Sequence, residues 1–154
     1  MSTTRSKSMQ HYEIEFWLDE PLERVWEFFT NVNNLTRSTP DWLDFAPDAV
    51  PARLDVGVDI DYRLRWRGLP LRWTSRIVDW QPMQVFTYEQ RRGPYRHWRH
   101  EHYFEPEAGG VRVVDRVYWR AWGGRLVRPW VARDVARIFS HRVDASRSLL
   151  HTES

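Results

Sequence analysis

The sequence predicts an α+β domain in which an antiparallel sheet curls around a long C-terminal helix. Between residues 57 and 122, apolar and polar residues alternate in five successive runs, the pattern of half-buried strands joined by short turns. After residue 124 the apolar residues recur every three or four positions, as in an amphipathic helix. We expect one domain over residues 10–150, preceded by a disordered tail over residues 1–9.

Before these runs, the chain predicts one strand and two short helices. "HYEIEFWL" at residues 11–18 alternates apolar and polar side chains, which indicates a strand. "PLERVWEFF" at 21–29 places apolar residues at helical spacing behind a proline that suits a first turn. Residues 35–56 contain three prolines and favour a short second helix followed by a connecting loop.

The five alternating runs predict a meander. They are "VDIDYRLRW" at 58–66, "LRWTSRIVDW" at 71–80, "VFTYEQRR" at 85–92, "HWRHEHYF" at 97–104 and "VRVVDRVYWRAW" at 111–122. A helix of roughly 20 residues after the meander would be about 30 Å long, enough to lie across the whole sheet.

Composition narrows the classes of function. The chain has no cysteine, which excludes disulfides and thiolate chemistry, and its 22 arginines and one lysine face 21 acidic residues, for a net charge of +2. Neither the polar start of the chain nor any later stretch resembles a signal peptide or a span of about 20 apolar residues. We therefore expect a cytoplasmic protein with no membrane span and no cofactor.

Three of the six histidines lie within the run at residues 97–104. Residues two apart in a strand share a face, so His100 and His102 point to the same side as the apolar Trp98 and Phe104 beside them. His97 points to the other side. Keeping the apolar faces of neighbouring strands together places Asp115 opposite His100 or His102.

The same reasoning predicts an inward polar cluster of Tyr88, Gln90, His100, His102 and Asp115, for which four interpretations remain open. Its members could only satisfy one another, since unpaired buried polar groups are costly. They could offer hydrogen bonds in a mainly apolar ligand cavity. His100, His102 and Asp115 could also hold iron or zinc, although no metal is our expectation, or they could act as catalytic acid and base.

The opposite sheet face carries many arginines. Outward positions include Arg63, Arg65, Arg72, Arg76, Arg99, Arg112, Arg116 and Arg120, interleaved with Trp80, Tyr103, Tyr118 and Trp122. Such a surface could bind nucleic acid, but acidic residues share the face and can pair with the arginines. We expect no nucleic-acid partner; a homodimer contact stays open.

Several segments resemble the START-like, helix-grip SRPBCC superfamily, in particular its small bacterial ligand-binding branch of polyketide cyclase-like and CoxG-like proteins. The segments are "PLERVWEFF" at 21–29, "NLTRSTPDWLDF" at 34–45, "GLPLRWTSRI" at 68–77, "GPYRHWRHEHYF" at 93–104, "VVDRVYW" at 113–119 and "RIFSHR" at 137–142. The resemblance implies a curved antiparallel sheet of about seven strands gripping the C-terminal helix, with a hydrophobic cavity between them. It also implies that residues 34–45 lie near the cavity mouth.

We expect the protein to bind a hydrophobic or aromatic small molecule, lipid-like or polyketide-like, in this cavity. The candidate ligand-binding residues are Tyr62, Trp66, Trp73, Ile77, Phe86, Tyr88, Gln90, Trp98, Phe104, Val117, Trp119, Ile138 and His141. The alternative is an enzyme of cyclase, dehydratase or hydrolase type. In that case His100 or His102 would act as the general base, oriented by Asp115.

Overall fold

The computed structural model describes residues 9–152 of the 154-residue chain. Except for Met9, the predicted tail over residues 1–9 lies outside the described residues. Among the described residues, no helix has both the length and the apolar character needed to cross a bilayer.

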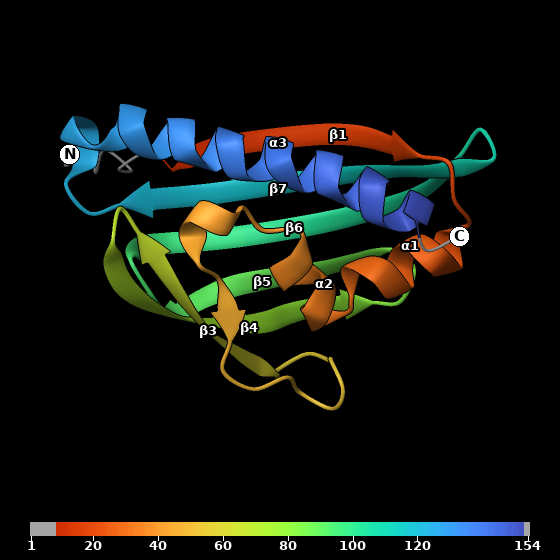
Figure 1. Cartoon of the computed structure of the whole chain (residues 1–154), viewed down its shortest axis with the longest axis horizontal. Helices are drawn as coiled ribbons and strands as arrows, with labels where there is room; N and C mark the ends of the chain where they lie inside the picture. Colours follow the sequence, from red (N-terminus) through yellow and green to blue (C-terminus); the bar gives the residue numbers. More distant parts are fainter. Residues whose placement is uncertain (1–8, 153–154) are drawn as a thin grey trace, which may run out of the picture.

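Within residues 9–152, seven strands and three α-helices follow one another in the predicted order (Figure 1). The strands are β1 (Gln10–Leu18), β2 (Ala46–Pro47), β3 (Asp59–Trp66), β4 (Leu69–Gln81), β5 (Val85–Arg92), β6 (Tyr95–Glu107) and β7 (Gly110–Ala121). The helices are α1 (Leu22–Phe29), α2 (Val32–Arg37) and α3 (Arg128–Thr152), with 3₁₀ turns at Asp41–Leu43 and Gly124–Leu126. The predicted meander is thus β3 to β7.

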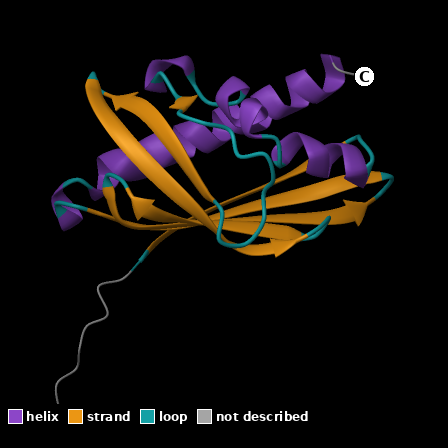
Figure 2. Cartoon of the chain, turned by 90° about the horizontal axis from the view of Figure 1, so that it is seen from below, coloured by secondary structure: helices purple, strands orange, loops and turns teal. Residues whose placement is uncertain are grey.

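The strands form one antiparallel sheet in the order β1-β7-β6-β5-β4-β3-β2. Figure 2 shows the sheet bending around the side on which the helices lie. Because β1 pairs with β7, it forms the edge of the sheet next to the strand that leads into α3. The predicted α+β helix-grip fold, with seven strands and two short helices after the first, is confirmed.

α3 turns one face toward the concave side of the sheet. Val135, Phe139, Val143 and Leu150 are buried along it at spacings of four, four and seven residues, as expected for one stripe of a helix. Pro129 occupies the first turn, where its missing N–H costs no hydrogen bond. At 25 residues, α3 is long enough to span the sheet.

The space between sheet and helices is packed solid at one end, which we call the filled end. Here α1 meets the C-terminal part of α3, and Trp26 packs edge-on against Trp80, Phe86 and Phe104 at 5.2–5.6 Å between ring centroids. Arg24 ties α1 to α3 by donating from Nη2 to the Leu150 carbonyl at 3.0 Å. The filled end comprises Phe16, Leu18, Val25, Trp26, Phe28, Phe86, Phe104, Val111, Val113, Val143 and Leu150.

Irregularities in two strands overturn part of the predicted face assignment. The register of β4 shifts between Ile77 and Asp79, so that Trp80 pairs with Phe86 and faces the interior. Strict alternation had placed Trp80 outside; an extra residue in one strand reverses the facing of every later side chain. A similar shift in β6 between Tyr95 and His97 brings Tyr95 inward.

The outer face of the sheet carries many ion pairs between arginines and acidic residues. Arg99 contacts Glu89 and Glu101 at 2.8 and 2.9 Å, and Arg116 contacts Glu13 at 2.8 Å. The other outward arginines in such pairs are Arg63 with Asp48, Arg65 with Asp44, Arg76 with Asp59, and Arg112 with Glu15, Glu105 and Glu107. Each of these contacts is partly exposed, and such surface pairs add only about 0–1 kcal/mol apiece.

Candidate functional site

At the other end, between the N-terminal half of α3 and the strands, lies a cavity of about 350 Å³, which we call the hollow end. Aromatic and aliphatic side chains make up most of its wall. The lining residues are Leu35, Thr39, Leu43, Phe45, Tyr62, Leu64, Trp66, Leu71, Trp73, Ser75, Tyr88, Pro94, Tyr95, Trp98, His100, His102, Ala121, Trp122, Val127, Val131, Asp134, Ile138, Phe139 and Arg142.

Many of the candidate residues come together in this wall. They are Tyr62, Trp66, Trp73, Tyr88, Trp98, His100, His102 and Ile138. Trp73 and Trp98 meet edge to face at 5.3 Å, and Tyr95 packs against both rings. Such T-shaped contacts hold large rings in fixed orientations, which gives the cavity a rigid aromatic floor.

Other candidate residues lie elsewhere. Phe86 and Phe104 belong to the filled end, while Ile77, Val117 and Trp119 are buried outside the cavity lining.

Two polar candidates also lie outside the lining. Gln90 bridges the β5–β6 turn, donating from Nε2 to the Tyr95 carbonyl at 2.8 Å and accepting from the Tyr95 N–H at 3.1 Å. His141 lies on the exposed side of α3 and does not line the cavity, although it is only three residues from Ile138.

Some lining residues were not among the candidates, and a signal existed for several. Leu35, Thr39, Leu43 and Phe45 come from the segment that the resemblance placed near the cavity mouth. Asp134 and Arg142 extend the helical stripe of Ile138 by four residues in each direction, but their charges argued against an inward position. Tyr95 could not be found from alternation because of the shift in β6.

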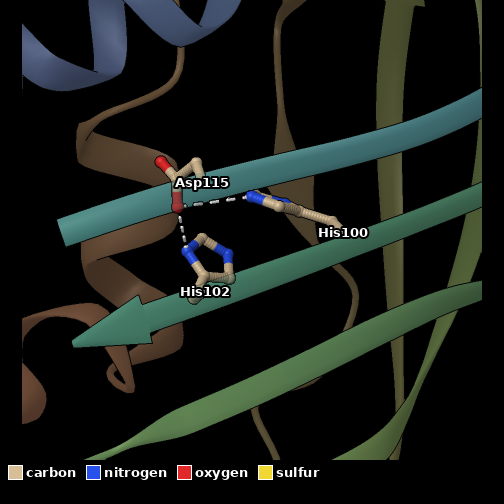
Figure 3. A group of neighbouring side chains, drawn as sticks. All are labelled: His100, His102 and Asp115. Carbon is tan, nitrogen blue, oxygen red and sulfur yellow. Dashed lines mark ion pairs between the residues drawn. The ribbon is translucent and has the colours of Figure 1, made fainter. Parts of the chain in front are cut away.

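His100, His102 and Asp115 meet where the hollow end joins the filled end (Figure 3). β6 carries both histidines and β7 carries Asp115, which pairs with His102 in the strand register. Asp115 Oδ1 lies 2.6 Å from His102 Nδ1 and 3.5 Å from His100 Nε2. All three side chains are buried, and neither contact has the alignment of a full hydrogen bond, so the cluster is held by electrostatic attraction as well as by packing.

Burial and neighbouring side chains together shift the pKa values of this cluster. Removal from water, followed by the neighbouring His102, lowers the pKa of His100 to about 3, so its imidazole is neutral at neutral pH. Burial would raise the pKa of Asp115, but His102 and His100 outweigh it and hold that pKa below its ordinary value. The result is a buried carboxylate between two imidazole rings.

The same three residues form the one group among residues 9–152 whose ligand atoms could hold a metal ion. Their nitrogen and oxygen atoms all lie within 4.8 Å of one another. Two imidazoles and a carboxylate on neighbouring strands suit iron or zinc. The 2.6 Å between His102 Nδ1 and Asp115 Oδ1 is the length of a charge-assisted hydrogen bond, although the two groups lack its alignment.

Asp134 is the centre of a second group of polar contacts, near the start of α3. Its Oδ2 accepts a hydrogen bond from Trp66 Nε1 at 2.9 Å and lies 3.8 Å from an Arg67 nitrogen. The Arg67 guanidinium in turn stacks over the rings of Trp66 and Trp130 at 5.2–5.3 Å. These contacts hold the β3–β4 hairpin against α3 beside the cavity.

Known structures with the same arrangement of elements cover nearly the whole chain. TTHA0849 from Thermus thermophilus matches with a TM-score of 0.77 and 17% identity, over 94% of this chain and 99% of the other. The Zhui aromatase/cyclase from Streptomyces sp. R1128 has a TM-score of 0.72 and 20% identity, over 94% of each chain. Ara h 8.0201 has a TM-score of 0.74 and 14% identity, over 94% and 99%.

At the level of sequence, no protein-family model and no curated protein matches the chain. Identities of 14–20% over full length are evidence of shared architecture, whereas activity depends on the side chains of the site. The chain has the START-like helix-grip fold, and the resemblance predicted from its sequence is confirmed at the level of that fold.

Proposed function

We propose that this protein binds a hydrophobic, aromatic small molecule in the hollow end. The observation that carries the proposal is the cavity of about 350 Å³, walled mainly by aromatic side chains and containing a few placed polar groups. Its volume and its composition are those of small-molecule sites. The flat faces of Trp66, Trp73 and Trp98 suit a planar ligand, since offset stacking and edge contacts both favour ring systems.

The likeness to an aromatase/cyclase supports a polyketide-like ligand and keeps an enzyme as the second candidate. His100 lines the cavity with Asp115 behind it, which is the arrangement of a base and its orienting carboxylate. A general base works best when its pKa lies near the working pH, and a histidine of pKa about 3 is a weak base. This low pKa argues against His100 as the general base.

The binding proposal can be tested with N-phenyl-1-naphthylamine, an uncharged aromatic probe that fluoresces in apolar surroundings. We expect saturable binding by the wild-type protein. In the Ile138→Trp variant an indole ring replaces the smaller isoleucine side chain in the cavity wall. The ring should fill part of the cavity and weaken binding by about tenfold or more, a cost of about 1.4 kcal/mol. Ser140→Trp adds the same ring on the exposed side of α3 and serves as the matched control.

Binding that is absent in the wild type, or equal in Ile138→Trp and Ser140→Trp proteins of native circular dichroism, would contradict the cavity as the site. Mass spectrometry of compounds released from the purified protein would then identify the natural ligand class. Cyclisation of a bound polyketone that is lost in a His100→Ala variant still able to bind the probe would favour the enzyme instead.

A further inference from the structure

Arg142 is a partly buried cation in the wall of a mainly apolar cavity. α3 carries it one turn beyond Ile138, and it lines the hollow end as well as a small recess behind His102. Its Nε is buried with no hydrogen-bond partner, and within residues 9–152 its guanidinium has no ion pair. The guanidinium lies over the ring of Phe139, 5.3 Å from the ring centroid.

Neither buried acidic side chain of the described chain pairs with Arg142. Asp115 interacts with it electrostatically, but the close contacts of the Asp115 carboxylate are with His102 and His100. Asp134 is engaged by Trp66 and Arg67. The Asp115 carboxylate therefore attracts the positive charge of Arg142 from a distance. No carboxylate of residues 9–152 forms an ion pair with it.

An isolated charge in an apolar interior is expensive, and side chains of this kind are normally paired. A guanidinium remains protonated at neutral pH even when burial lowers the pKa of Arg142, since its ordinary value is above 12. Its fork of N–H groups matches the two oxygens of a carboxylate. An oxyanion carried by a ligand has the charge and geometry to pair with this guanidinium.

We propose that Arg142 anchors an anionic group, and that the ligand is an aromatic or apolar molecule bearing a carboxylate or a comparable oxyanion. The inference rests on the proposed binding function and adds the polarity and the orientation of the ligand. The charged group lies deep, near Arg142, and the ring system extends toward Trp66, Trp73 and Trp98.

Two tyrosines can support the same anion. Tyr62 and Tyr88 line the cavity and interact electrostatically with Arg142. Burial raises the pKa of Tyr62 and of Tyr88, so both phenols keep their protons and remain hydrogen-bond donors. The two phenols therefore add hydrogen-bond donors to the same cavity wall as Arg142 without adding a second positive charge.

The experiment compares two probes with the same ring system. 8-Anilinonaphthalene-1-sulfonate carries an anionic sulfonate, and N-phenyl-1-naphthylamine lacks it. The ratio of their dissociation constants isolates the contribution of the anion, because loss of the aromatic cavity would weaken both. Arg142→Met removes the charge while retaining an apolar stem, and Arg133→Met removes a charge from the exposed side of α3 as the matched control.

We expect Arg142→Met to weaken sulfonate binding by about 10- to 100-fold, the usual effect of a hydrogen bond to a charged group, and to leave the neutral probe nearly unchanged. Arg133→Met should keep the wild-type ratio. Arg142→Lys should fall between wild type and Arg142→Met, and it keeps the test decisive if Arg142→Met does not fold.

Equal ratios in wild type, the Arg142 variants and Arg133→Met would overturn the anion anchor while leaving the binding function intact. If neither probe binds the wild-type protein, the binding function itself fails. The two outcomes are therefore distinguishable in one series of titrations.

Discussion

Acidification should destabilise this protein through His100. The pKa of His100 is about 3 in the folded chain because burial, reinforced by His102, opposes its charged form, whereas the ordinary value is 6.5. The unfolded chain therefore binds more protons than the folded chain between these values. The contribution of His100 to the free energy of unfolding is complete above pH 6.5 and is lost progressively as the pH falls toward 3.

The size of the loss follows from the two pKa values. Between about pH 7 and about pH 4.5 the free energy of unfolding should fall by about 2–3 kcal/mol on account of this one side chain. For a chain of this length that corresponds to a drop of roughly 5–10 °C in melting temperature. His100 is 4% exposed, so solvent screening does not reduce the effect.

Urea denaturation at a series of pH values measures this directly, with the His100→Gln variant as the comparison. The variant should be less stable than the wild type at neutral pH but should lose about 2–3 kcal/mol less on acidification, because the titrating group is gone. His141→Gln, on the exposed side of α3, should retain the wild-type pH dependence. Parallel pH profiles for His100→Gln and the wild type would refute the reasoning.

Two further predictions concern packing. Gly110→Ala would place a Cβ 2.2 Å from the Leu18 carbonyl oxygen, so β1 must shift and stability should fall by about 1–3 kcal/mol in chemical denaturation; unchanged stability would contradict the close approach of β1 and β7. Trp26→Ala removes the central ring of the filled end and should cost about 3–5 kcal/mol, yet leave the affinity for N-phenyl-1-naphthylamine within about twofold, as measured by thermal melting and fluorescence titration. A large loss of affinity would show that the two ends are coupled.

Alternation of residue types was enough to predict the sheet, because most of its strands are regular. Keeping apolar faces together across short turns predicted that Asp115 lies opposite His100 or His102, and the strand register pairs it with His102. The same reasoning fails at the irregularities of β4 and β6, where one additional residue reverses the facing of Trp80 and Tyr95. Nothing in the local composition of these strands marks the extra residue.

The sequence also could not predict which of the inward side chains line the cavity. Alternation identifies which side chains face inward, but it does not separate those that pack against α1, such as Phe86 and Phe104, from those that face an open volume. That division depends on where α1 and α2 lie along the sheet. Arg142 illustrates the same limit, since helical spacing placed it beside Ile138 while its charge suggested the surface.

The separation of the interior into a filled end and a hollow end has a consequence for how such a protein can change. Folding free energy is concentrated where Trp26, Trp80 and Phe86 interlock, while Leu64 and Leu71 border the cavity and contribute less buried contact. Substitutions at such partly exposed wall positions should therefore cost less stability than substitutions at the filled end. A descendant of this sequence could exchange one ligand for another by replacing wall residues alone, with its scaffold inherited unaltered.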